Sequence, residues 1–468
     1  MTHKIISIVF VSLALTSKVY SADFYVTEFS DVYQESCSDN CSLRGAIETA
    51  NNLPGKDRIF LSSGEYQIEI EVPMEDSWGG YSQSQVGDTP NDKGDFDITD
   101  DLEIHGTSAV QTIVNGNHIS RVFHIEQGDV LLKDLTITRG RGNGGVSYGG
   151  GIQNDSTLTL SGVVLRENGV GSWNAAIGGG ISNNGTLNIY KSKLINNGVS
   201  HADDSTAHGG GIFNAEGAVL TVRDTLFLKN TSISEGGEGG GLYNRGTADV
   251  RRVLFAKNRL GDRAVRGGSA VANTGSGKLK IVSSSFYANE GGDEYWAGFA
   301  IVNVTDNNNK NPEQELSMTN VSIVMNTQGG LYTNNRTYMK NVLIADNFTT
   351  EFMSEDPSLL NCHLDFSGGT WRQYVAQEAV LTNRYPRDCR NDLSILDPHQ
   401  SVISEVKLID LTQEELQSLE LYSTSEAIDR GVAPCPHYDQ DGNMAPVDGD
   451  NDGVAECDIG ASEWQPEQ

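Results

Sequence analysis

Carboxylates and a histidine gather in one short stretch of the chain, and two arginines follow in another. Asp203 and Asp204 come shortly before His208. Glycoside hydrolases cleave sugar chains with carboxylates held close together, so these residues are candidates for that chemistry. Arg263 and Arg266 could serve a polysaccharide lyase, which needs a base and neutralises the charge of a uronate, often with Ca²⁺. Neither set matches a hydrolase or lyase signature, so whether the chain is an enzyme stays open.

Three aromatic residues, Trp173, Tyr295 and Trp296, lie in stretches of the same kind. Aromatic plates flanked by acids and arginines suit a sugar chain that lies along a surface. They are therefore the candidates for ligand binding. An ordinary solvated loop surface is the alternative.

A third group of polar residues lies near the C-terminus. Asp448, Asp450 and Asp452 alternate before a glycine, and Glu456 follows them. This spacing is typical of a calcium loop, and these four residues are the predicted metal ligands. The pattern departs from an EF-hand, because Ile459 stands at the twelfth position. A plain acidic turn is the alternative.

A repeat of about 30 residues must position the first two groups. Its marker is Gly-Gly-Gly followed by an aliphatic residue, a variable residue and Asn. The last Asn recurs every 29 to 31 residues, with decayed copies from the fifth onward: Asn154, Asn183, Asn214, Asn244, Asn273, Asn303 and Asn334. A second track, close to Phe-x-x-Asn, runs in the same period and ends at Asn168, Asn197, Asn230, Asn258, Asn289, Asn326 and Asn347.

Short runs that alternate apolar and polar residues, such as Thr157–Leu160, surround each glycine run and predict strands. Several short strands in a 30-residue period predict one rung of a parallel β-helix. The recurring Asn residues predict ladders in which each amide bonds the amide of the next rung. The stretches between Phe-x-x-Asn and the next glycine run are predicted loops on one edge, where solenoids usually bind: 169–177, 198–208, 231–238, 259–266 and 290–296.

The two ends of the chain differ from the repeats. Residues 1–21 have the basic start, apolar run and cleavage site of a secretion signal. An amphipathic helix with Ser42 as its N-cap is predicted to plug the first end of the stack, with Arg44 in a buried salt bridge or capping contact. All six cysteines lie outside the repeats, and nearest-neighbour pairing predicts the disulfides Cys37–Cys41, Cys362–Cys389 and Cys435–Cys457.

The segment Cys41-Ser42-Leu43-Arg44-Gly45-Ala46-Ile47 resembles the CSLREA motif of secreted bacterial right-handed β-helix proteins, with Gly45 in place of the usual Glu. The glycine and Phe-x-x-Asn tracks resemble those of polymorphic outer-membrane proteins, which are adhesin-like β-helices. The resemblance implies an all-β, right-handed parallel β-helix of the pectate-lyase-like kind. It implies no single activity, since one fold hosts many functions.

The formal net charge of −30 argues against nucleic acid and anionic membrane as partners. No apolar run after the signal is long enough to span a membrane as a helix. We therefore expect a secreted, monomeric protein that is not an integral membrane protein. The predicted organisation is signal peptide, N-terminal cap, β-helix repeats, irregular rungs, and C-terminal cap with the calcium loop, at 1–21, 22–75, 76–348, 349–425 and 426–468.

Two functions follow from this organisation. The first is an adhesive or carbohydrate-binding scaffold that contacts an extracellular glycan or a cell surface. The second is a polysaccharide lyase or glycoside hydrolase acting on an extracellular glycan. Ca²⁺ is the one cofactor that the sequence suggests.

Overall fold

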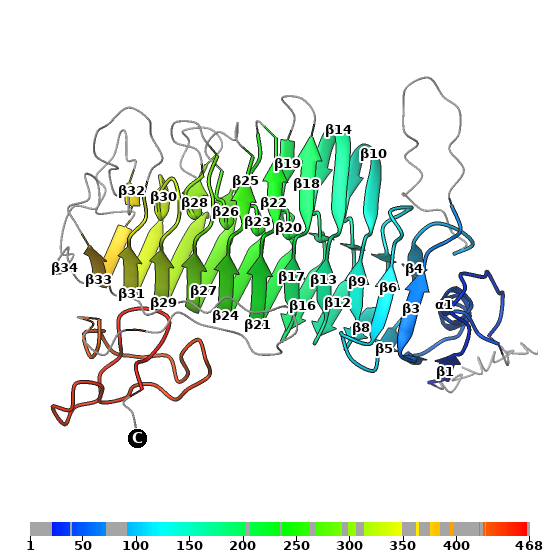
Figure 1. Cartoon of the computed structure of the whole chain (residues 1–468), viewed down its shortest axis with the longest axis horizontal. Coiled ribbons are helices and arrows are strands. Elements are labelled where there is room, and N and C mark those ends of the chain that lie inside the picture. The colour runs from blue at the N-terminus through cyan, green and yellow to red at the C-terminus, as the bar shows by residue number, and fades with distance from the viewer. Residues whose placement is uncertain are drawn as a thin grey trace, which may run out of the picture.

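The chain forms a right-handed parallel β-helix capped by one short helix (Figure 1). The computed structural model describes residues 21–37, 40–71, 91–201, 206–234, 236–261, 267–292, 298–305, 313–348, 421, 425 and 427–465, and the backbone of 362–364, 375–383 and 394–396. Nearly all of the predicted signal peptide lies outside these residues. Among the described residues, no helix is both long and apolar enough to cross a membrane.

Most strands belong to one sheet of 18 strands, the wide sheet, in which neighbouring rungs pair in parallel. Its strands are β1 (Asp23–Val26), β2 (Asp57–Leu61), β3 (Gly64–Gln67), β5 (Leu102–His105), β6 (Thr112–Asn115), β8 (Asp129–Lys133), β9 (Thr136–Thr138), β12 (Thr157–Ser161), β13 (Val164–Arg166), β16 (Thr186–Tyr190), β17 (Lys193–Ile195), β21 (Val219–Leu228), β24 (Thr247–Ala256), β27 (Lys278–Tyr287), β29 (Glu315–Val324), β31 (Thr337–Ala345), β33 (Val375–Asn383) and β34 (Ser394–Leu396). Parallel stacking thus already begins with β1 and β2, within the stretch expected to form the cap.

A second sheet of ten short strands, the narrow sheet, closes the other side of each rung. Its strands are β4 (Phe96–Ile98), β7 (Phe123–Ile125), β11 (Ile152–Asn154), β15 (Ile181–Asn183), β20 (Ile212–Asn214), β23 (Leu242–Asn244), β26 (Val271–Thr274), β28 (Ile301–Val304), β30 (Leu331–Thr333) and β32 (Cys362–Leu364). The core between the two sheets is built from aligned aliphatic residues and a stack of Phe227, Phe255 and Phe286.

The sequence pattern predicts loops after the Phe-x-x-Asn track. That prediction was wrong, because the described residues of these stretches are largely strands. They form a third sheet, the fin, which runs along the upper edge of the stack in Figure 1. Its strands are β10 (Arg141–Tyr148), β14 (Gly169–Ile177), β18 (Gly198–His201), β19 (Thr206–His208), β22 (Thr231–Ile233) and β25 (Arg259–Leu260). Val170, Ala176, Val199 and Ala207 form a small apolar cluster there, separate from the main core.

The three glycines of the repeat marker are needed for three different reasons, as the second copy shows. Gly178 has φ of 68°, in the left-handed region that favours glycine. A Cβ on Gly179 would lie 2.4 Å from the carbonyl oxygen of Gly198, at the base of the fin. A Cβ on Gly180 would lie 2.6 Å from the carbonyl oxygen of Gly211 in the next rung. The glycines thus let the chain turn and let neighbouring backbones approach closely.

Both predicted asparagine ladders are confirmed. From Asn154 to Asn303, each Nδ2 donates to the Oδ1 of the next rung at 2.7–2.8 Å. From Asn168 to Asn347, the same bond measures 2.8–3.0 Å. The seventh copy of the first track was misaligned by one residue, because Thr333 pairs with Asn303 and accepts its Nδ2–H at 3.2 Å.

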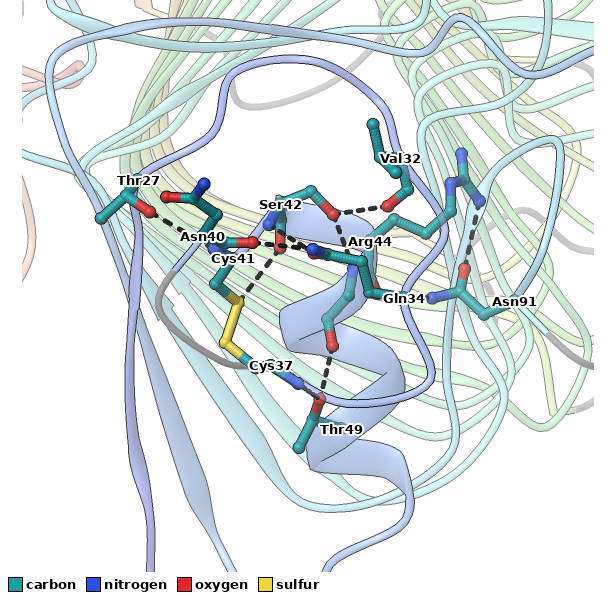
Figure 2. Close-up of a disulfide and its surroundings, with 11 residues drawn as sticks. Thr27, Val32, Gln34, Cys37, Asn40, Cys41, Ser42, Arg44, Thr49 and Asn91 are labelled. Atoms are coloured by element: carbon teal, nitrogen blue, oxygen red, sulfur yellow. Dashed lines mark hydrogen bonds between the residues drawn. A yellow bond between two sulfur atoms is a disulfide. The ribbon is translucent and has the colours of Figure 1, made fainter.

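The predicted N-terminal helix is present as α1 (Leu43–Asn51), and Ser42 caps it by accepting the Gly45 N–H at 3.0 Å. Figure 2 shows the Cys37–Cys41 disulfide directly before this helix. As predicted, Arg44 forms a buried salt bridge, with Nε 2.6 Å from Asp31 Oδ1. The helix lies at the start of the stack in Figure 1 and packs against β1, β2 and β4.

The described C-terminal segment, residues 427–465, lies along the flank of the wide sheet rather than only at its end. It contacts three successive rungs, since Ser283, Asn320 and Asn341 donate to carbonyl oxygens of this segment at 3.1–3.4 Å. The Cys435–Cys457 disulfide ties the segment to itself, as the nearest-neighbour pairing predicts. Of the third predicted pair, Cys389 and the side chain of Cys362 lie outside the described residues.

Candidate functional site

Most of the catalytic and ligand-binding candidates from the sequence lie outside the described residues. These are Asp203, Asp204, Arg263, Arg266, Tyr295 and Trp296. Trp173 lies in β14 of the fin, although its side chain is not among those described. His208, at the end of β19, is therefore the one of these candidates whose surroundings can be examined.

His208 stacks on an aromatic side chain of the narrow sheet. Its ring centroid lies 4.2 Å from that of Tyr243, and Phe213 stacks on the same tyrosine at 5.5 Å. Burial, and then the nearby charge of Arg245, lower the pKa of His208 to about 4. The imidazole is therefore neutral at pH 7, and its lowered pKa makes it a weaker base than an ordinary histidine. Glu238 Oε2 lies 4.0 Å from its Nδ1.

The middle residues of the narrow-sheet strands form an outward row in register, with one side chain per rung. In chain order the row begins with Asp97, His124, Gln153, Ser182, Phe213 and Tyr243, and it continues with Ala272, Val302 and Tyr332. The first four of these residues are polar, and the next two are aromatic. Next to it, Asp155 accepts hydrogen bonds from Gln153 at 2.8 Å and from Asn184 at 2.6 Å.

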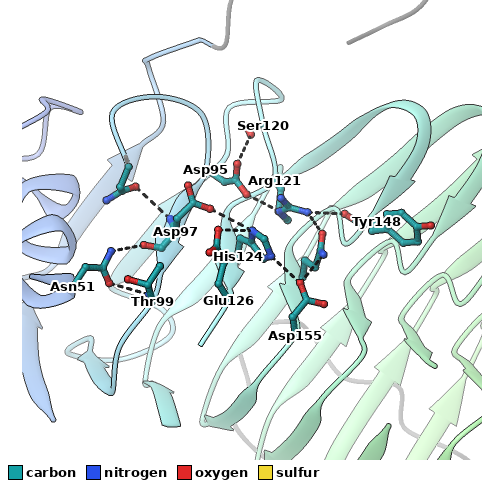
Figure 3. Close-up of polar contacts among 12 residues, drawn as sticks. Asn51, Asp95, Asp97, Thr99, Ser120, Arg121, His124, Glu126, Tyr148 and Asp155 are labelled. Atoms are coloured by element: carbon teal, nitrogen blue, oxygen red, sulfur yellow. Dashed lines mark hydrogen bonds and ion pairs between the residues drawn. The ribbon is translucent and has the colours of Figure 1, made fainter. Parts of the chain in front are cut away.

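Asp97 and His124 of the outward row belong to a cluster of charged residues from three rungs, which sequence reasoning did not assemble (Figure 3). We call Asp95, Asp97, Arg121, His124, Glu126 and Asp155 the first-rung cluster. Asp95 and Asp97 belong to an acidic stretch for which the sequence favours a solvated strand face or loop, with Ca²⁺ binding as the alternative. The solvated position is wrong, because both residues are at most 1% exposed. Arg121 of the next rung offsets the energetic cost of burying the Asp95 carboxylate, because its Nε lies 2.6 Å from Asp95 Oδ2.

His124 lies at the centre of the first-rung cluster, as Figure 3 shows. Its Nε2 lies 2.8 Å from Asp155, and its Nδ1 lies 3.3 Å from Asp97 and 3.5 Å from Glu126. Burial alone would lower the pKa of His124, but the contacts with Asp155 and Asp97 outweigh it and raise the pKa to about 9. Asp95, Asp97 and His124 place potential ligand atoms within 4.8 Å of one another, so the cluster could hold a metal ion.

The predicted calcium loop forms a compact turn, with potential ligands contributed by two of the four predicted residues. Asp448 and Asp450 come together with Asp429, which the sequence analysis did not include. Asp452 and Glu456 are not part of that group. The backbone N–H groups of Gly449 and Asp450 both donate to Asp429 Oδ2 at 2.7 Å. The group could hold a metal ion.

Two more carboxylates are buried beside this loop. Burial, and then the charge of Glu463, raise the pKa of Asp458 to about 7. Burial also raises the pKa of Glu463. An acid whose pKa is raised by folding favours the folded state at low pH, and this contribution is lost as the pH rises through about 7. The segment should therefore pack less stably above neutral pH unless a cation compensates the charge.

Comparisons with known proteins add one likeness of fold. No protein-family model matches the chain, and no curated protein matches it in sequence. A solved structure described as the crystal structure of pectate lyase Pel9A is similar, with a TM-score of 0.49 and 13% identity. The match covers 96% of this chain and 98% of that chain. The likeness concerns the fold alone.

Proposed function

We propose that this protein is a secreted carbohydrate-binding or adhesive scaffold, and that a glycan lies along the outward row of the narrow sheet. The observation that carries the proposal is the pair Gln153 and Phe213, which are in register two rungs apart and both partly exposed, with the fully buried Ser182 between them. Rungs of a β-helix repeat at about 4.8 Å, which is close to the length of one sugar ring. An elongated sugar chain could therefore place successive rings over successive rungs.

The chemistry of these side chains suits a sugar. Phe213 is half-buried and stacks on Tyr243 on one side, while the neighbouring rung contributes only the small Ser182. A sugar ring could use the other face of Phe213, since carbohydrates present apolar C–H faces to aromatic rings. The exposed amide of Asn184 and carboxylate of Asp155 lie beside the row as partners for hydroxyl groups.

Truncating Phe213 should weaken glycan binding about tenfold, the loss of a stacking contact on the order of 1 kcal/mol. We would measure binding to a panel of uronate and neutral polysaccharides with wild type and Phe213→Ala. Tyr338→Ala is the matched control, since Tyr338 is an outward aromatic of the wide sheet that is 39% exposed. Equal binding by the Phe213 variant, or no binding by wild type, would remove the support for this surface.

A lyase or hydrolase is the second candidate function, and the position of His208 favours it. Histidine is a common general base, and this one lies beside the outward row against Tyr243. If the chain is an enzyme, His208→Ala should lower turnover by about 100-fold or more, without an equal loss of binding. Unsaturated products detected by ultraviolet absorbance would identify a lyase, and reducing ends alone a hydrolase. No turnover by wild type across the panel would leave the scaffold as the proposal.

Secretion is part of the proposal, and two features support it. The disulfides Cys37–Cys41 and Cys435–Cys457 suit an oxidising compartment. Residues 1–21 have the composition of a signal peptide. A glycan or cell surface is the proposed partner. The acidic net charge of −30 disfavours nucleic acid.

We also propose that the C-terminal loop binds Ca²⁺ through Asp429, Asp448 and Asp450. Hard oxygen ligands suit this ion, and its charge would relieve the repulsion among the neighbouring carboxylates. Calcium at 100 times its dissociation constant should stabilise the protein by about 2.7 kcal/mol, seen as a rise in melting temperature that EDTA reverses. Asp448→Asn should abolish the rise, whereas Asp346→Asn, outside the loop, should keep it. A rise that is unchanged in Asp448→Asn would place the ion elsewhere.

A further inference from the structure

The first-rung cluster holds more negative charge than its own basic groups can neutralise. Its four carboxylates face one permanently charged cation, Arg121. Because two of the carboxylates are buried, uncompensated negative charge is costly there, and a bound divalent cation would offset it.

His124 is oriented as a metal-binding histidine is. Asp155 Oδ2 lies 2.8 Å from its Nε2, and two amide side chains hold Asp155 in place. When Nε2–H donates to this carboxylate, the lone pair of the ring lies on Nδ1. Nδ1 faces Asp97 Oδ1 at 3.3 Å and Glu126 Oε1 at 3.5 Å. A carboxylate behind the far nitrogen is the usual support of a metal-binding imidazole.

The ring nitrogen that faces the carboxylates is buried and lacks a hydrogen bond. The side chain of His124 is 8% exposed, and neither its Nδ1 nor Glu126 Oε1 has a hydrogen-bond partner among the described residues. The 3.3 Å between Nδ1 and the Asp97 oxygen is about the separation of two ligands in a tetrahedral site with bonds of about 2.0–2.1 Å. Imidazole with carboxylates is a donor set for Zn²⁺ and similar first-row ions.

We propose that the first-rung cluster binds a divalent transition-metal ion, represented by Zn²⁺, through His124, Asp95 and Asp97, with Glu126 within 3.5 Å of the imidazole. Asp97 lies in β4 and His124 in β7, Asp95 directly precedes β4, and the supporting Asp155 follows β11. The ion would therefore tie together three successive rungs next to the helical cap. The site shares Asp155 with the proposed glycan surface, but metal binding is measured without a glycan and is tested separately.

The test uses the full secreted chain without a histidine tag, stripped with a chelator. Zn²⁺ binding would be measured by calorimetry and by metal analysis after dialysis, and Co²⁺ by its visible absorption. We expect His124→Gln to lose one equivalent of tightly bound metal and the Co²⁺ spectrum. His105→Gln should keep both, because His105 contacts Glu103 on the wide sheet. Asp448→Asn should also keep both, which separates this site from the calcium loop.

Asp155→Asn covers the case in which His124→Gln does not fold. Asp155 is exposed and touches no proposed ligand except His124, so its change should leave the fold intact and weaken Zn²⁺ binding by about 10–100-fold. Glu126→Gln should weaken binding as well. Wild type without a Co²⁺ spectrum, or Zn²⁺ binding that is equal in wild type and in the folded variants at these positions, would overturn the proposal.

Discussion

Replacing Asn230 by alanine should destabilise the protein by about 3–5 kcal/mol. Asn230 is fully buried in the middle of the longer asparagine ladder. Its Nδ2 donates to Asn258 Oδ1 at 3.0 Å and to the carbonyl oxygen of Leu194 at 2.9 Å. Its Oδ1 accepts both N–H groups that Asn197 directs at it, at 3.0 and 3.1 Å. Truncation leaves several of these buried groups without partners, each at a cost of about 1–3 kcal/mol.

The measurement is chemical denaturation followed by circular dichroism, with hydrogen exchange to locate the opened rungs. Asn184→Ala is the matched control, because Asn184 is exposed and makes its bond to Asp155 at the surface. It should cost less than about 0.5 kcal/mol. Asn230→Asp separates hydrogen bonding from packing, since the carboxylate has the same shape but cannot donate to Asn258. Equal stability of Asn230→Ala and Asn184→Ala would show that the ladder contributes nothing beyond burial.

The ladders and the strands of the main core could be predicted because they repeat. The partner of a single Asn cannot be predicted from the sequence. An Asn at the same position of every rung, however, lies at the spacing of paired strands from the equivalent Asn of the next rung and can bond to it. The error at Thr333 has the same origin. Asn334 follows Thr333 directly, so the sequence pattern selected the asparagine. The pairing of β28 with β30 shows that the hydroxyl of Thr333 continues the ladder instead.

The fin could not be predicted from local sequence. A stretch such as Gly169-Val170-Gly171-Ser172 has little preference for a strand, because glycine and serine are poor strand formers. It becomes a strand because the next rung offers an equally extended stretch, 198–201, as a partner. The signal that could have found it is Val170 above Val199, an apolar residue at the same place in two successive rungs.

The first-rung cluster was missed because it joins residues that the repeat marker does not include. Asp97 and His124 come before the first complete glycine run, so the two tracks of the repeat gave them no register. A shared local pattern could have found the pair. Phe96-Asp97-Ile98 and Phe123-His124-Ile125 both place one polar residue between two apolar ones, and in the structure they stack in register. Patterns of three residues recur by chance in most sequences. This pattern alone therefore does not establish that the two segments stack in register.

Replacing Arg44 by methionine should cost about 3–5 kcal/mol, because it leaves the buried carboxylate of Asp31 without a cation. Both side chains of the pair are at most 1% exposed, and Nη2 donates to the second Asp31 oxygen at 2.9 Å. Arg44 also donates to the carbonyl oxygens of Gly94 and Asp95 at 2.7 and 3.1 Å. Its guanidinium lies over Phe96, with the ring centroid 4.7 Å away. This one side chain therefore joins the cap to the first rungs.

Arg58→Met is the matched control for Arg44→Met. Arg58 makes the same two-bond contact with Asp23, at 2.8 Å for both bonds, but the arginine is 47% exposed. Exposed ion pairs contribute about 0–1 kcal/mol to stability. The free energies of unfolding of the two variants, obtained from the midpoint and slope of chemical denaturation, should therefore differ by several kcal/mol. Adding Asp31→Leu to Arg44→Met should recover part of the loss, since no buried charge remains. Equal losses from Arg44→Met and Arg58→Met would mean that the cap is held by its apolar face alone.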